Sequence, residues 1–319
     1  MVGVIIILVT AFYLPIWDTS APYGKTFSLD LSVPVDSSDN SYTYLPAKGE
    51  RTKTEISALE VVRRGYATAT KALTPTQLAQ VIIDTESLVK KFKEAVTRDV
   101  YQCPNLLNQF NYDATPCDLG NLREMAALAI FHTEYHLGQG DVIRARALLN
   151  SALKLSRLVA YQDQPTYLDL LVSYAVIDSV LNILDSPGGR SVGELQTFQI
   201  STSSLSKAII REYVSGRSLL TTKLAQSRTT YWPQPQRTQN LLTLHTDNEL
   251  QFIERPCGDR EAARVLEEQF LAAQFRPELG SAVIGPNAGG RILIELLVAA
   301  RLAVTLKEGA CAINERVAK

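Results

Sequence analysis

Two histidines are spaced so that both could bind one metal ion. His132 and His136 lie four residues apart in the segment HTEYH, and on a helix such residues share one face. A site needs three or four ligands, so His245 or a carboxylate from another helix would have to complete it. The alternative is a pair of partly buried histidines between helices. We therefore expect no bound metal, with His132 and His136 as the candidates if one is present.

Other patterns associated with catalysis are missing from the sequence. HTEYH differs from the HExxH motif of metalloproteases, and no GxSxG motif of serine hydrolases occurs. The glycine-rich turn at 285–291 lacks the Gly-Lys-Ser/Thr of a phosphate-binding loop, which favours a turn before a helix. Carboxylates such as Asp84, Glu86 and Glu124 fall within predicted helices, where solvated faces are their ordinary position. We therefore predict no catalytic residue and no cofactor from the sequence.

The four cysteines could form two disulfides. Cys103 and Cys117 enclose a polar loop, and a bridge between them would close about 15 residues and contribute about 3 kcal/mol in the chain-entropy model. Cys257 and Cys311 could form the second pair. Four partly buried free thiols are the alternative. Disulfides would favour a location outside the cytoplasm.

The chain begins with an apolar run, Val2 to Trp17, that contains no charged residue. As a helix it would be about 24 Å long, near the thickness of a bilayer core. It lacks the basic start and the small-residue cleavage site of a signal peptide, and a buried core helix would have a polar face. We therefore expect an uncleaved single-span anchor with the body on the periplasmic side. Its membrane-facing residues would be Val4, Ile5, Ile6, Ile7, Leu8, Phe12 and Trp17.

The composition excludes several classes of protein. Of 319 residues, 46% are hydrophobic, and 32 Lys and Arg face 33 Asp and Glu, for a net charge of −1. Such a chain is too apolar and too nearly neutral to be disordered. It has no excess of positive charge to bind nucleic acid. The sequence predicts a folded body whose partners are membrane lipid and other subunits of a membrane complex.

Residues 18–50 are expected to form a tether between the anchor (1–17) and the body (51–319). Alternating apolar residues at 27–35 predict a strand, and 41–45 could return as a second strand of a β-hairpin. Such a hairpin would need to lie on the body or on a partner. The partner contacts within it would be Phe27, Leu29 and Leu31.

From about Thr54 the apolar periodicity is helical and predicts an all-α body. Thr74 and Asp118 are placed to cap two of its helices, and Gly140 to reverse the chain between two others. Residues 226–257 are polar and contain prolines, so we expect a long loop there. Its aromatic residues, Tyr231, Trp232 and Phe252, would contact a partner.

The segment at 126–155 predicts a hairpin of the tetratricopeptide type. Gly140 allows the turn, and small residues at Ala145 and Ala152 let its second helix approach the first closely. The first helix departs from the consensus, with Ala129 and Thr133 where an aromatic residue and a glycine are expected. An ordinary helical hairpin is the alternative.

A wider pattern covers about Asn121 to Leu306. It comprises "GD" followed by LKLSRLVAYQDQPTYLDLLVSYAV, then IIREYVSGRSLL and NAGGRILIELLVAARLAVTL. It resembles a group of uncharacterised bacterial envelope proteins, in which one N-terminal anchor precedes an all-α body of tetratricopeptide-like hairpins. The resemblance implies an irregular right-handed array of helices and an envelope location, and it transfers no catalytic residue.

Three functions remain open from the sequence. The first is a membrane-anchored scaffold or accessory subunit that acts by protein–protein contact. The second is an envelope enzyme with an all-helical cleft. The third is an electron-transfer subunit that holds a metal or cofactor through His132 and His136. We expect the first.

Overall fold

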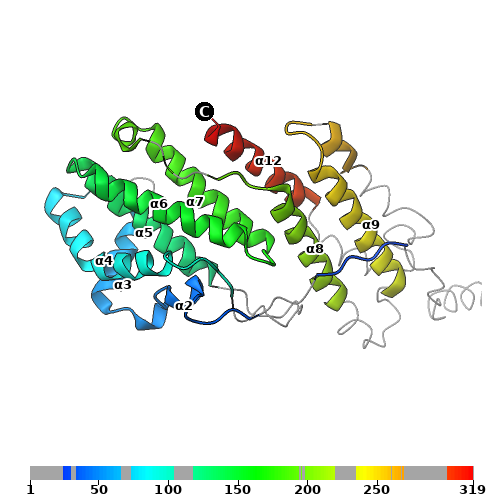
Figure 1. Cartoon of the computed structure of the whole chain (residues 1–319), viewed down its shortest axis with the longest axis horizontal. Helices are drawn as coiled ribbons and strands as arrows, with labels where there is room; N and C mark the ends of the chain where they lie inside the picture. The colour runs from blue at the N-terminus through cyan, green and yellow to red at the C-terminus, as the bar shows by residue number, and fades with distance from the viewer. Residues whose placement is uncertain are drawn as a thin grey trace, which may run out of the picture. The chain divides into compact units, whose positions relative to one another are not determined.

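The computed structural model of the chain is helical (Figure 1). It describes residues 24–29, 34–65, 73–103, 118–193, 195, 198–219, 235–259, 261–266, 268 and 300–318. No β-strand occurs in these ranges, where strand-like pairing is limited to one isolated bridge between Asn40 and Val100. The predicted all-α class is confirmed.

The chain divides into two compact units. One, here called the hairpin unit, comprises Leu31–Gln109, Thr115–Ser204 and Gly309–Lys319. The other, here called the α9 unit, comprises Met1–Asp30, Phe110–Ala114 and Leu205–Glu308. Each is described by itself below.

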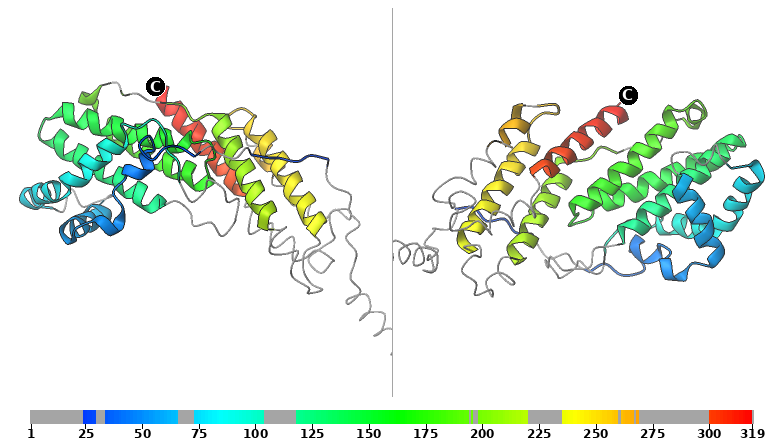
Figure 2. Two further views of the ribbon diagram at one scale, coloured as in Figure 1. Left: turned by 60° about the horizontal axis from the view of Figure 1, so that its bottom comes forward. Right: turned by 180° about the vertical axis from the view of Figure 1, so that it is seen from behind.

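In the hairpin unit, consecutive helices pack against one another. α6 packs against both α5 and α7, and α5 also contacts α3, α4 and α7 directly. Figures 1 and 2 show α5, α6 and α7 side by side. The elements of this unit are α2 (Ser41–Tyr44), η1 (Lys48–Glu50), α3 (Lys53–Gly65), α4 (Pro75–Ala95), α5 (Leu119–Gly138), α6 (Val142–Ala160), α7 (Tyr167–Asp185) and η4 (Gly189–Val192).

Helix starts in this unit are fixed by short polar side chains. The Thr74 hydroxyl accepts from the Gln77 amide while the Gln77 side chain accepts from the Thr74 amide, a capping box before Pro75. Asp118 and Asp141 cap α5 and α6 by accepting backbone N–H groups of the first turn. The caps predicted at Thr74 and Asp118 are confirmed.

The turn between α5 and α6 is tight because Gly140 has a positive φ of 76°. The Asp141 amide then donates to the His136 carbonyl at 2.8 Å, which closes the end of α5. Ala145 and Ala152 of α6 are both fully buried. A helical hairpin with inward-facing alanines is confirmed, and its tetratricopeptide type stays a prediction.

Among the described helices, α7 is the one whose length and apolar composition would allow it to cross a membrane. Its most apolar window is 56% buried within the protein, and it packs against α5 and α6. Such burial is equally typical of the core helix of a globular unit. The predicted anchor, residues 1–17, lies outside the described residues.

An ion network joins the start of the body to α5, in which Arg51 and Glu124 are buried and the Arg63 side chain is 66% exposed. Arg51 and Arg63 both donate to the carboxylate of Glu124, and Arg51 also donates to Asn121. The Arg51 and Glu124 side chains are 4% and 8% exposed. Burial alone would raise the pKa of Glu124, but the hydrogen bonds from the two arginines outweigh it and hold that pKa below its usual range.

The predicted β-hairpin is wrong in its second strand. Residues Ser41–Tyr44 form the short helix α2, because the Asn40 side chain caps it by accepting from the Tyr42 amide. The amide group of Asn40 also bonds both backbone groups of Gln102, which fixes this segment against the end of α4. The described parts of the first predicted strand, 27–29 and 34–35, are not strand either. Helical structure therefore begins inside the predicted tether.

The predicted loop at 226–257 is wrong over most of its length. Residues Pro235–Ile253 form α9, which begins with a proline and buries Leu241, Leu242 and Phe252. Its periodicity is carried largely by polar side chains, which hides it from a search for apolar residues. The chain also forms α8 (Thr202–Leu219) and α12 (Ala300–Val317), each of which contains a boundary between the units.

Within the α9 unit, hydrogen bonds hold α9 and the residues that follow it. The Tyr213 hydroxyl of α8 lies 3.2 Å from the Thr243 hydroxyl. The Lys307 ammonium donates to the carbonyls of Phe252 and Arg255, both at 2.6 Å, and lies over the Phe252 ring. Burial lowers the pKa of Lys307.

Candidate functional site

His132 is a fully buried residue of α5 with a defined tautomer. The Thr85 hydroxyl donates its proton to the Val81 carbonyl at 2.7 Å, so it must accept from His132 Nε2 at 2.8 Å. The ring proton therefore lies on Nε2, and Nδ1 has no hydrogen-bond partner. Burial, with a smaller effect of His136, lowers the pKa of His132 to about 4.

His136 follows one turn later, and its ring centre is 6.4 Å from that of His132. Its Nδ1 is 3.9 Å from a carboxylate oxygen of Asp141. Burial lowers the pKa of His136, although the Asp141 carboxylate acts in the opposite direction. Both rings thus share one helix face, as their spacing predicted.

The two histidines lack a third ligand in the described part of the chain. No group of three His, Cys, Asp or Glu side chains that could hold a metal ion occurs there. His245 lies on α9, in the other unit, where its Nε2 is 3.3 Å from a Glu249 carboxylate oxygen. His132 is held by Thr85 as a packing residue.

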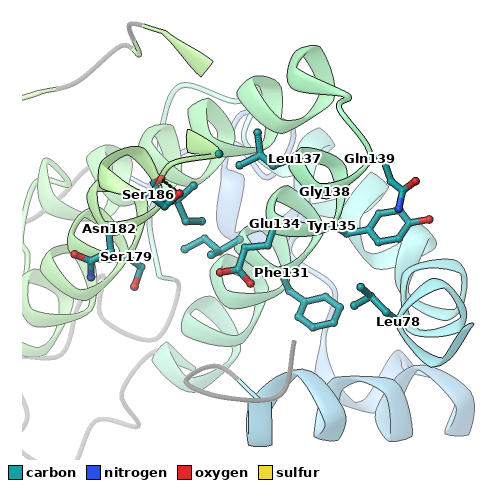
Figure 3. Close-up of a pocket in the computed structure, with 13 residues that line it drawn as sticks. Leu78, Phe131, Glu134, Tyr135, Leu137, Gly138, Gln139, Ser179, Asn182 and Ser186 are labelled. Atoms are coloured by element: carbon teal, nitrogen blue, oxygen red, sulfur yellow. Dashed lines mark hydrogen bonds between the residues drawn. The ribbon is translucent and has the colours of Figure 1, made fainter. Parts of the chain in front are cut away.

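An open groove runs between the C-terminal halves of α5 and α7 in the hairpin unit, with Leu78 of α4 at its edge (Figure 3). The cavity measures about 600 Å³. Ile130, Phe131 and Ile183 line it from the core and are buried. Its remaining lining includes the polar residues Ser179, Asn182 and Gln139. An apolar lining with a few polar groups is typical of ligand-binding sites.

Glu134 is the charged residue of this groove. Figure 3 shows its side chain between Ser179 and Asn182 on one side and Leu78 on the other. The side chain is exposed, and it makes no hydrogen bond or ion pair with any described residue. The surrounding protein nevertheless raises the pKa of Glu134 by desolvation. This combination gives an accessible carboxylate that is partly desolvated and has no counter-ion among the described residues.

The predicted partner-contact residues lie elsewhere. Phe27 packs edge-on against Tyr213 in the α9 unit, with ring centres 5.2 Å apart, and Leu29 is half-buried. Phe252 is buried in α9, so its side chain is not available to a partner in this structure. The residues Leu31, Tyr231 and Trp232 and the anchor residues Val4, Ile5, Ile6, Ile7, Leu8, Phe12 and Trp17 lie outside the described residues.

Cys103, Cys257 and Cys311 are each disulfide-bonded. Cys117 lies outside the described residues, and the pairing of the four cysteines stays a prediction.

Sequence reasoning missed the groove because its two walls are distant in sequence. Glu134 stands out only as the acidic residue between His132 and His136 in an otherwise apolar helix segment. That signal marks a partly exposed position on α5. It does not show that the end of α7 lies opposite.

Comparison of the chain with protein-family models, curated proteins and solved structures finds no match.

Proposed function

We propose that this protein is a membrane-anchored extracytoplasmic scaffold or accessory subunit of a membrane complex, which acts by protein–protein contact. The observation that carries the proposal is the open α5–α7 groove with a carboxylate, Glu134, that has no partner in the described part of the chain. A partly desolvated charge without an internal partner costs free energy that a bound partner can recover.

The packing of the hairpin unit supports a binding role. α3 packs against both α4 and α5, and α5 packs in turn against both α6 and α7. This order of contacts is what an array of tetratricopeptide-like hairpins would have, and such arrays bind partners along the surface formed by alternate helices. In that comparison α5 and α7 are the alternate helices, and the groove lies between them.

Two further features favour the envelope. Disulfides persist in oxidising compartments and are rare in the cytosol, and the three described cysteines are all disulfide-bonded. The uncharged apolar run at 2–17 fits a membrane anchor by length and composition. Together they favour a body tethered to the periplasmic face of the membrane.

The proposal is tested by the native mass of the full chain after gentle detergent extraction from its own membranes. We expect the chain to remain in the membrane fraction after a carbonate wash. We also expect it to elute as an assembly that contains a second protein at fixed stoichiometry. Release by the carbonate wash, or a clean monomer without such a protein, would contradict the proposal.

A further inference from the structure

We propose that the α5–α7 groove binds a partner segment that places one lysine or arginine side chain, flanked by apolar residues, against Glu134. This inference rests on the proposed function and names the chemistry of the partner. The charge in and around the groove is negative, as three separate features show.

The first feature is the lining itself. Among the groove residues that the structure describes, Glu134 is acidic and none is Lys, Arg or His. Glu134 lies between apolar Leu78 and the polar residues of α7 (Figure 3). A cation in this position would replace water around a carboxylate that the protein has already partly desolvated, so the interaction would be stronger than at an open surface.

The second feature is the direction of the two helices. The groove is lined by the C-terminal ends of both helices. Leu137 and Gly138 belong to the last turn of α5. Ile183 lies in the last turn of α7, and Ser186 follows the end of that helix. Helix C-termini carry partial negative charge and favour cations nearby. The last turn of α7 contains no basic residue, and that of α5 contains only His136, whose pKa is lowered.

The third feature is the negative charge on the face of α7 near Asn182. Asp178 and Asp185 share a single arginine, Arg316, at 2.5 Å and 2.6 Å, and Arg316 also donates to Asn182. Two carboxylates with one guanidinium leave a net negative charge beside the groove. An acidic partner would therefore be repelled from this face.

The apolar lining sets the rest of the partner. Ile130, Phe131 and Ile183 offer contacts to aliphatic or aromatic side chains next to the basic residue. The cavity, about 600 Å³, lies within the range of about 300–1,000 Å³ for sites that enclose a small ligand. It therefore suits one long basic side chain with its immediate neighbours.

The test uses the full chain in detergent micelles and three fluorescein-labelled seven-residue peptides. All have alternating leucine and alanine around a central residue, which is lysine, N-acetyl-lysine or glutamate. Fluorescence anisotropy should show the lysine peptide binding about tenfold more tightly than the N-acetyl-lysine peptide, because only lysine carries the charge. The glutamate peptide should bind more weakly still.

Two variants test whether the preference for lysine depends on Glu134. Glu134→Gln keeps the shape of the side chain and removes the charge, so it should abolish the preference for lysine. Glu94→Gln is the matched control, because Glu94 is an exposed glutamate of α4 outside the groove and makes no side-chain bond. It should leave the preference unchanged.

The inference is overturned if the wild-type chain binds the lysine and N-acetyl-lysine peptides equally or binds neither. It is also overturned if Glu134→Gln keeps the preference. These outcomes are separate from the native-mass test. An assembly that forms without any preference for lysine would refute the basic partner and leave the scaffold role standing.

Discussion

Two ionisable residues of α5, His132 and Glu134, lie two positions apart and experience opposite surroundings. His132 is buried in the core, and its hydrogen-bond partner among the described residues is Thr85. Glu134 projects into an open groove and has no partner in the described chain. In both cases desolvation favours the neutral form, so it lowers the pKa of the histidine and raises that of the glutamate. His132 therefore makes stability depend on pH, whereas the charge of Glu134 remains available for binding.

Stability should fall in acid because of His132. Its pKa is about 4 in the folded chain against 6.5 for a free side chain. Between these values the unfolded state takes up a proton and the folded state does not, so stability is lost as pH falls from about 6.5 to about 4. From pH 7 to pH 4.5 the loss should be about 2.5 kcal/mol. Urea unfolding followed by circular dichroism at both pH values measures it.

His132→Gln serves as the comparison, because glutamine can still donate to Thr85 but does not titrate. The variant should lose about 2.5 kcal/mol less than the wild type over the same pH range. The other groups that face His132, which are Glu86 on α4 and His136 on α5, are the same in both proteins. Equal pH dependence in the two proteins would show that His132 is not held neutral.

At the scale of the element, the sequence was most informative where a cap or turn residue fixes a helix end. Thr74, Asp118 and Gly140 each act locally, so their roles can be read from neighbouring residues. The predicted β-hairpin is wrong because a strand-like pattern at 27–35 and 41–45 does not show that these segments pair. Asn40 instead caps α2 and bonds to Gln102, a contact that no local pattern reveals.

The predicted loop at 226–257 is wrong for a different reason. The buried face of α9 includes Asn240, Thr243, Thr246 and Asp247, so the helical period is present but is carried by polar side chains. Asp247 is paired with Lys25, which lies far away in the sequence. The groove was likewise unpredictable, since it requires the ends of α5 and α7 to meet.

The packing of α6 can be tested with a pair of alanines. Ala152 is fully buried among α5 and α7, whereas Ala147 lies on the exposed face of the same helix. Ala152→Leu should overpack the core and lower the free energy of unfolding by about 1–3 kcal/mol. Ala147→Leu should change it by less than about 0.5 kcal/mol. Thermal or urea unfolding of both variants checks this, and equal effects would mean that α6 is not closely packed at Ala152.

In the whole molecule, the hairpin unit combines a closely packed interior with a groove whose carboxylate, Glu134, has no partner among the described residues. The Arg51–Glu124–Arg63 network and the close α5–α6–α7 packing fix the positions of the helices. The groove between α5 and α7 therefore has walls that do not need to form on binding, which reduces the entropy cost of association. This is the property that a scaffold requires.

The most direct test of the account compares two glycine variants in the native-mass experiment. Gly138 lines the groove at the end of α5, and a side chain there would begin in open space, as it would at Gly49 in η1, outside the groove. Gly138→Trp should fill the groove without disturbing the fold and reduce the assembly with the second protein at least tenfold. Gly49→Trp should leave it intact. Assemblies of equal abundance in the wild type and both variants would contradict the α5–α7 groove as the partner-binding site.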